Sequence, residues 1–227
     1  MTHLELELKE LKESLLELAN LTFKQLSKAV DAFQNMDLNL AQEVIKSERR
    51  VNAIELKIDR DCENIVALYN PVAIDLRLVF AVFKINSHLE RIGDYAEGIA
   101  RYVLKVKEKF SDEFLGRLQF KAMADTAFEM LSLITVALQN DNAYVARNVF
   151  EKDSLLDKIN AAANGIISDE IRAHSDKTES LLHLLSIVQK LERVGDMSTN
   201  IAEEIIFYLE AKVLKHSKKD EKRNNPE

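Results

Sequence analysis

Two short motifs in the sequence combine paired carboxylates with a glycine. They read Glu90-Arg-Ile-Gly-Asp94 and Glu192-Arg-Val-Gly-Asp196. If both segments are helical, the two acids of each motif lie about one turn apart and project from the same helix face. Two like charges at that spacing repel each other by roughly a few tenths of a kcal/mol. A hard cation held between their oxygens would offset this repulsion, so the motifs are candidate metal sites.

Each motif also places a glycine inside a predicted helix. An internal glycine costs about 1 kcal/mol relative to alanine, and Gly93 and Gly195 are two of only 5 glycines in the chain. A missing side chain lets a neighbouring helix or a bound cluster come close. We expect that neighbour to carry Glu48 in the first half of the chain and Asp153 in the second half. Each half would then offer three carboxylates.

A solvated acidic face is the alternative interpretation of these residues, because Arg91 or Arg193 could neutralise the pairs. No histidine follows a glutamate by three residues. A ferritin-like di-iron oxidase needs that spacing, so oxygen chemistry is disfavoured. The sequence also lacks the motifs of a nucleotide cradle, a zincin site and a nucleophile elbow. These absences argue against an enzyme.

An internal repeat places the acids at matching positions. Segments 20–48 and 125–153 align at a constant offset of 105, with Phe23 opposite Phe128 among the identities. Segments 89–100 and 191–202 align at an offset of 102, so the second copy is shorter between its second and third helices. Glu48 and Asp153 are equivalent in this alignment.

Apolar residues recur at helical spacing through both copies, and the breaks between them delimit six helices of about 30 residues. Pro71 follows a helix end, and Asp176 with Glu179 predicts a capping box. Helices joined by short turns run antiparallel. We therefore predict an all-α fold of two repeated three-helix bundles related by a pseudo-twofold. The bundles would span residues 1–110 and 111–216, followed by a charged flexible tail at 217–227.

Composition excludes several classes of function. With 5 Gly and 2 Pro in 227 residues, the chain has too few turn residues for a β or β/α fold. A net charge of -7 disfavours nucleic acid as a partner. The single cysteine fits a reducing compartment, and the amino terminus lacks the pattern of a signal peptide. Because the longest apolar stretch is also too short to span a bilayer, we expect a cytoplasmic protein that meets membranes only through partners.

The repeated L-E-R-[IV]-G-D motif, with the stretch Asp75-Leu-Arg77 ahead of its first copy, resembles the PhoU family of phosphate-signalling proteins. The resemblance extends over nearly the whole chain. It implies a regulator of phosphate transport and phosphate homeostasis that acts by negative regulation of the phosphate-starvation response. Its partners would be the ATPase of the phosphate ABC transporter and a phosphate-sensing histidine kinase. A homodimer is implied as well.

The same resemblance implies a metal-binding protein. Its metal ligands would be Glu90 and Asp94 in the first copy and Glu192 and Asp196 in the second, with Glu48 and Asp153 from the second helices. Iron clusters are the leading expectation for the metal ions, and zinc, manganese and magnesium are the alternatives. Position 98 departs from the family pattern. It holds glycine, where the second copy and most relatives have asparagine, here Asn200.

Asp75 and Arg77 are candidate partner contacts because this stretch has no counterpart in the second copy. The alternative is a surface ion pair near a helix start. Two functions of different class stay open. One is the regulatory metal-binding scaffold, and the other is a metal-buffering or purely structural helical interaction protein whose acidic faces keep it soluble. We expect neither to be an enzyme.

Overall fold

A computed structural model describes residues 2–106 and 108–214, which hold α-helices, one 3₁₀ turn and no strand. The predicted all-α fold of two repeated three-helix units is confirmed, and the predicted tail at 217–227 lies outside the described residues. No helix in the described ranges is long and apolar enough to cross a membrane. The elements are α1 (His3–Asn35), α2 (Leu38–Tyr69), α3 (Ala73–Val103), α4 (Asp112–Arg117), α5 (Phe120–Asn140), α6 (Ala143–Ala173), η1 (Ser175–Lys177) and α7 (Thr178–Glu210).

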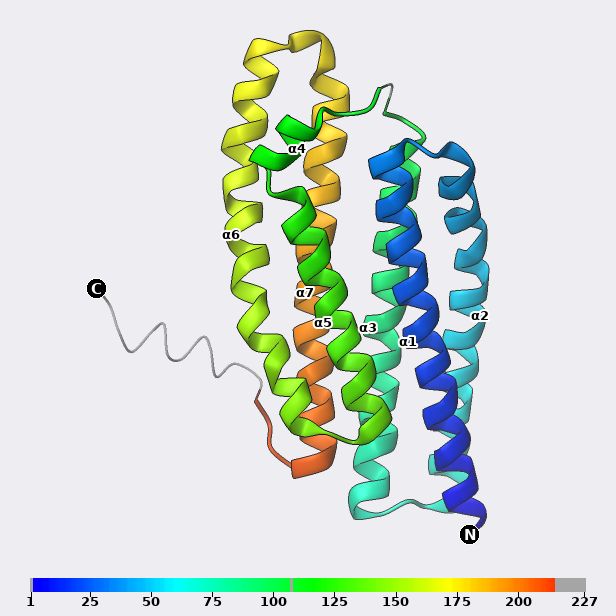
Figure 1. The fold of residues 1–227 in the computed structure, drawn as a ribbon. Coiled ribbons are helices and arrows are strands. Elements are labelled where there is room, and N and C mark those ends of the chain that lie inside the picture. Colours follow the sequence, from blue (N-terminus) through cyan, green and yellow to red (C-terminus); the bar gives the residue numbers. More distant parts are fainter. Residues whose placement is uncertain (1, 107, 215–227) are drawn as a thin grey trace, which may run out of the picture.

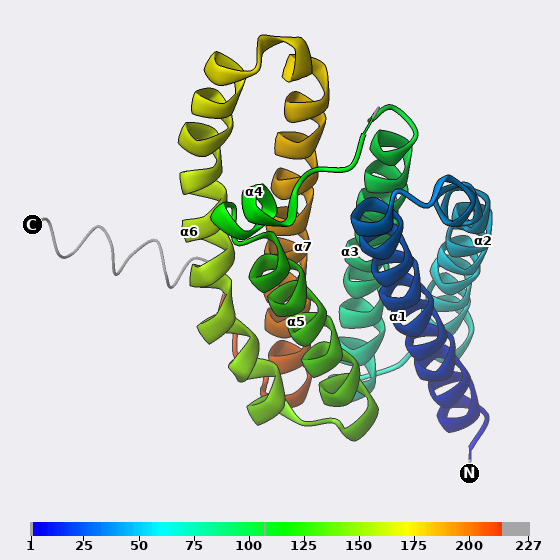
Figure 2. The ribbon, with the colours of Figure 1, turned by 45° about the horizontal axis from the view of Figure 1, so that its top comes forward.

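The helices form two antiparallel bundles that share a seam (Figure 1). Helices α1, α2 and α3 make the first bundle, and α5, α6 and α7 make the second. Along the seam α3 packs against α7 and α1 packs against α5, while α4 crosses one end of the second bundle (Figure 2). The buried apolar residues of both bundles form one continuous core. The predicted limits 1–110 and 111–216 meet between α3 and α4, and the division into two domains stays a prediction.

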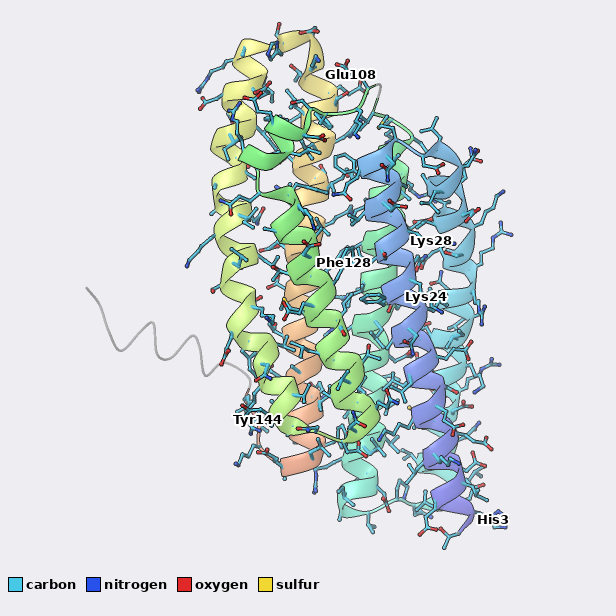
Figure 3. The ribbon with its side chains drawn as sticks, viewed as in Figure 1. His3, Lys24, Lys28, Glu108, Phe128 and Tyr144 are labelled. Atoms are coloured by element: carbon cyan, nitrogen blue, oxygen red, sulfur yellow. The ribbon has the colours of Figure 1, made fainter. Side chains whose placement is uncertain are left out.

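Two equivalent phenylalanines meet at the seam. The rings of Phe23 on α1 and Phe128 on α5 have centroids 5.9 Å apart with an interplanar angle of 59°. Figure 3 labels Phe128 on the side of α5 that faces α1. A residue that contacts its own equivalent lies on a twofold axis. The pseudo-twofold between the copies therefore passes close to these two rings.

The first turn of each bundle is built in the same way. Met36 and Asp141 are equivalent, and both end a helix in the left-handed region, with φ of 54° and 49°. The next residue then caps the following helix. Asp37 Oδ1 accepts hydrogen bonds from two backbone N–H groups of α2, and Asn142 Oδ1 does the same for α6. Equivalent cap residues thus hold equivalent turns.

The start of the second bundle departs from the prediction. The expected helix of about 30 residues is wrong there, because α5 has only 21 residues and is preceded by the separate six-residue helix α4. Gln119, with φ of 53°, divides the two. The physical reason is an aromatic cluster at this end of the molecule. Phe33 contacts Phe110 and Phe120, with ring centroids 6.0 and 5.0 Å away, and the turn at Gln119 places Phe120 in the core against Phe33, while Phe110 is half-buried.

One cap was predicted correctly and one wrongly. Helix α2 ends at Tyr69 ahead of Pro71, with Asn70 as its left-handed C-cap. The capping box at Asp176 is absent, because Asp176 lies inside η1, and α7 begins after Lys177 without a side-chain cap bond. Because Asp176 is part of this 3₁₀ turn, it does not stand at the N-cap position that the pattern predicted for it.

Candidate functional site

Helices α2 and α3 bring the three predicted carboxylates of the first bundle into one neighbourhood, the first acidic cluster: Glu48, Glu90 and Asp94. Glu48 on α2 is buried, with 6% of its surface exposed, whereas Glu90 is half-buried and Asp94 exposed. Desolvation is the largest cause that raises the pKa of each. It brings the pKa of Glu48 to about 7, with repulsion from Asp94 and Glu90 adding to the shift.

Gly93 explains why Glu48 can lie so close to α3. A Cβ at Gly93 would lie 3.4 Å from Glu48 Oε2, 3.3 Å from Gln25 Oε1 and 3.1 Å from Val51 Cγ1. These contacts are as tight as or tighter than ordinary van der Waals packing, so an added methyl group would press on both α1 and α2. As the sequence suggested, the glycine lets the neighbouring helix that carries Glu48 come close.

A glutamine that the sequence did not indicate completes this cluster. Gln25 Nε2 on α1 donates a 2.7 Å hydrogen bond to Glu48 Oε2. The other oxygens of the pair, Glu48 Oε1 and Gln25 Oε1, are buried and have no hydrogen-bond partner among the described residues. A buried oxygen without a donor costs about 1–3 kcal/mol. Both oxygens lie in the neighbourhood of the half-buried Glu90 and the exposed Asp94, and each lacks the donor or cation that would satisfy it.

The second acidic cluster, Asp153, Glu192 and Asp196, lies between α6 and α7. Desolvation is again the largest cause that raises the pKa of Glu192 and Asp196, followed by repulsion from nearby carboxylates, Asp153 among them. A Cβ at Gly195 would lie 3.5 Å from Asp153 Oδ1 and would collide with Leu156 Cδ1. The structure therefore brings all six predicted carboxylates into two equivalent neighbourhoods, each beside a glycine.

Further acids lie beside the clusters. Repulsion from Glu97 raises the pKa of Asp94 and Glu48, and repulsion from Glu55 raises that of Glu90. Repulsion from Asp157 likewise raises the pKa of both Glu192 and Asp196. Glu97 and Asp157 follow a predicted acid by three or four residues, which is the signal that could have identified them. They were missed because they do not recur between the copies.

A groove of about 510 Å³ opens beside the first acidic cluster. Its lining mixes acidic and basic side chains, and Arg101 Nη2 donates a 2.7 Å hydrogen bond to Glu97 Oε1. Within residues 2–106 and 108–214, no three His, Cys, Asp or Glu side chains are gathered so that they could hold a metal ion. The lining residues are Ile45, Lys46, Glu48, Arg49, Asn52, Glu97 and Arg101.

The structure places the predicted partner residues away from both clusters. Asp75 and Arg77 lie at the start of α3, more than three turns before Glu90, and both are half-buried. Arg77 Nε is buried with no hydrogen-bond partner among the described residues. Just before them, Ala73 has a φ of 50°, a conformation that is strained for alanine. The segment is therefore a distinct feature of the first bundle.

Comparison with known proteins points to one family. A family model described as "PhoU domain" matches residues 15–103 and 120–205. The chain is 31% identical over 216 residues to "Phosphate-specific transport system accessory protein PhoU" of Escherichia coli K12, covering 95% of this chain and 88% of that protein. It is 30% identical to the homologue from Aquifex aeolicus, with 95% and 97% covered.

Solved structures agree with this match. The crystal structure of PhoU from Pseudomonas aeruginosa aligns with a TM-score of 0.86 at 28% identity, covering 92% of this chain and 99% of that one. The phosphate transport system regulatory protein PhoU from Streptococcus pneumoniae aligns with a TM-score of 0.81 at 29% identity, with 93% and 99% covered. The similarity therefore extends over both bundles.

Proposed function

The chain belongs to the PhoU family, and on that premise we propose that it is an accessory regulator of phosphate transport that represses the phosphate-starvation response. The names of its relatives support the link to a phosphate-specific transport system. In this proposal the chain is a cytoplasmic scaffold, active as a homodimer. It connects the ATPase of the phosphate ABC transporter to a phosphate-sensing histidine kinase and contacts the membrane only through them.

We further propose that the two acidic clusters bind metal ions, and the buried carboxylate of Glu48 is the observation that carries this part. Its Oε1 is buried without a partner among the described residues, and Gly93 lets the carboxylate lie close to α3. Carboxylate and amide oxygens are hard donors, which favour hard cations over copper. Iron is the first candidate, and manganese, magnesium and zinc are the other outcomes that a metal analysis would distinguish.

The residues of each cluster would have separate tasks. Glu48, whose Oε2 accepts a hydrogen bond from Gln25, would supply an oxygen ligand from α2, and the more exposed Glu90 and Asp94 would supply oxygens from α3. Asp153, Glu192 and Asp196 would hold the second ion. A bound cation supplies positive charge on a surface that otherwise repels anionic partners. In this proposal the chain recognises its partners, and the charge of the bound cations controls that recognition; the chain itself carries out no chemical step.

Metal analysis combined with thermal melting tests this proposal. Purified protein would be assayed by elemental analysis and melted with and without chelator, alongside Glu90→Ala/Asp94→Ala and Glu192→Ala/Asp196→Ala. We expect bound metal in the wild type, a lower melting temperature after chelation, and loss of metal in each variant. Without metal the variants should melt slightly higher than the wild type, because like charges have been removed. Glu10→Ala/Glu13→Ala, an exposed pair on α1, controls for net charge.

The opposite result would support the alternative function. If the wild type carries no metal, gains none on reconstitution and is unaffected by chelator, the clusters are solvated acidic faces. The chain would then act as a structural helical interaction protein. Metal bound without any effect on partner binding would indicate metal buffering.

A further inference from the structure

An open groove between α2 and α3 exposes large apolar side chains. It has a volume of about 360 Å³, and apolar atoms make up most of its surface. Phe80 and Phe83 of α3 and Val66 of α2 line it and are 50%, 45% and 39% exposed. The buried residues Cys62 and Val79 lie beneath them. Large apolar side chains gathered in one groove indicate an interaction surface, and a groove between two helices suits the apolar face of a third helix.

Three acids of α2 border this groove and continue beyond it, and we call them the acidic edge: Glu55, Asp59 and Glu63. They follow one another at intervals of four residues, so they share one face of α2. Glu63 lines the groove and is exposed. Asn86 of α3 donates hydrogen bonds of 2.8 Å to Asp59 Oδ1 and 2.9 Å to the Glu55 carbonyl, which places this stretch of α2 beside α3.

The basic side chains within the same stretch of α2 have other partners. Lys57 Nζ lies 3.0 Å from Asp61 Oδ2, and Arg60 Nε donates a hydrogen bond to the carbonyl of Leu56. The acidic edge therefore presents negative charge beside an apolar groove.

The combination of apolar groove and acidic edge belongs to the first bundle. At the offset of 102, Phe80 and Phe83 correspond to Leu182 and Leu185, so the second copy keeps apolar residues at these positions. At the offset of 105, the acidic edge corresponds to three uncharged residues: Asn160, Asn164 and Ser168. A ligand that needs both features would therefore distinguish the two bundles.

We propose that this surface binds a basic amphipathic helix of a partner protein. Apolar side chains three and four positions apart on that helix fill the groove between Phe80, Phe83 and Val66. Lysine or arginine residues beside them meet the acidic edge, whose outer members are eight residues and about 12 Å apart along α2. Complementary charge fixes the position of the helix along the groove and speeds its association. The inference is independent of the proposed metal binding.

Other occupants match only one part of the surface. Residues 215–227 of this chain contain no large apolar side chain, so they cannot fill the groove. A second copy that docked through the same surface would bring three further acids and no base to the acidic edge. An anionic membrane surface would be repelled by the acidic edge. A basic amphipathic helix matches both the apolar and the acidic part.

Selection from a library of helical peptides tests the inference. Displayed peptides of about 20 residues, with the positions of one face varied among Leu, Phe, Ser, Lys and Glu, would be selected on the full-length protein in the presence of chelator. We expect the selected peptides to combine apolar residues with lysines beside them. The affinity of the consensus peptide would be measured by fluorescence polarisation at about 0.1 M salt. Phe80→Ser/Phe83→Ser should weaken binding by about tenfold or more, and Glu55→Gln/Glu63→Gln by about fivefold.

The second bundle supplies a matched control. Leu182 is equivalent to Phe80 and is also 50% exposed, so Leu182→Ser should bind the peptide as the wild type does. A consensus peptide with glutamate in place of each lysine should bind at least about tenfold more weakly. Circular dichroism shows whether each variant is folded, and Phe80→Ser alone gives the same comparison if the double variant folds poorly.

Four results would overturn the inference. The selection yields no peptide, or it favours acidic or purely apolar peptides. Binding of the consensus peptide is the same in Phe80→Ser/Phe83→Ser as in the wild type. Self-association of the wild type is lost in that variant, which would make a second copy the occupant. Vesicles of phosphatidylserine and phosphatidylcholine bind the wild type and not the variant, which would make the groove a membrane contact. None of these results bears on whether the acidic clusters bind metal.

Discussion

Lys84 of α3 and Glu204 of α7 form an ion pair across the seam between the bundles, with 3.2 Å between Nζ and Oε2. The glutamate side chain is 3% exposed and that of the lysine 43%. The same ammonium lies 5.6 Å from the ring centroid of Phe207. Burial of a carboxylate is costly unless a partner charge offsets it. The pair therefore links α3 to α7 at this point of the seam.

Removing the lysine of this pair should weaken the seam. We expect Lys84→Met to lower the free energy of unfolding by about 2 kcal/mol, because the ammonium is taken from a buried carboxylate. The double variant Lys84→Met/Glu204→Gln should lose less than the sum of the single variants. Chemical denaturation of the four proteins measures the difference, with Lys121→Met as a control on charge. Additive losses would show that the pair contributes no coupling.

The stability of the metal-free protein should depend on the titration of Glu48. Its pKa rises from 4.5 to about 7 on folding, so between these values the folded state binds more protons than the unfolded state. Stability therefore falls as pH rises through this window. We expect Glu48→Gln to flatten the decline and to be more stable than the wild type at pH 8 by about 2 kcal/mol.

Urea denaturation in the presence of chelator, at several pH values between 5 and 8, measures this dependence. Glu10→Gln, at an exposed position of α1, is the control and should follow the wild type. A constant difference between Glu48→Gln and the wild type across the range would contradict the shifted titration of Glu48.

Replacement of a glycine by alanine should change the stability of the protein differently at different positions. In an open helix position the gain in helix propensity is about 1 kcal/mol. At Gly165 of α6 nothing lies within 4 Å of an added Cβ, so Gly165→Ala should stabilise by about that amount. At Gly195 the collision with Leu156 should outweigh the gain and cost about 1–3 kcal/mol. The change in stability caused by Gly93→Ala should lie between those of Gly165→Ala and Gly195→Ala. Melting temperatures measure the order, and equal shifts at all three positions would contradict it.

Asp75 and Arg77 should affect partner binding more than stability. Asp75→Ala/Arg77→Ala should weaken binding to the transporter ATPase by about tenfold, which corresponds to about 1.4 kcal/mol. Lys177, the last residue of η1, and Glu179 in the first turn of α7 provide a control, because they stand at the same places in the repeat and differ in residue type. Lys177→Ala/Glu179→Ala should bind as the wild type does. A sharp drop in melting temperature with unchanged affinity per folded molecule would make the two residues structural.

The repeat explains which parts of the fold and the site could be predicted from the sequence. The approach of Glu48 to Gly93, and of Asp153 to Gly195, followed from the helical period together with a pattern that occurs twice. Gln25 could not be predicted from the repeat, because the second copy has Met130 at that position. Only the hydrogen bond between the two side chains shows that Gln25 contacts Glu48.

The structural features that local sequence patterns did not predict depend on contacts between residues distant in the sequence or on the geometry of a turn. The division of α4 from α5 depends on Phe33, which is distant in sequence from the rings that it contacts. Asp176 carries a capping signal, but the tight turn of η1 leaves the start of α7 to Lys177. The placement of Lys190 of α7 over the ring of Tyr95 of α3 depends on the seam between the bundles. The apolar periodicity of a single helix does not indicate which residues of another helix it will contact.

The contact between Phe23 and Phe128 indicates how the chain could behave as two fragments. A fragment that ends before α4 would expose the faces of α1 and α3 that now pack against α5 and α7. Two such fragments could pair through those faces in the way the two copies pair here, with Phe23 meeting its own image. That assembly would dissociate on dilution. Joining the copies in one polypeptide makes the association intramolecular, at an effective concentration that dilution does not change.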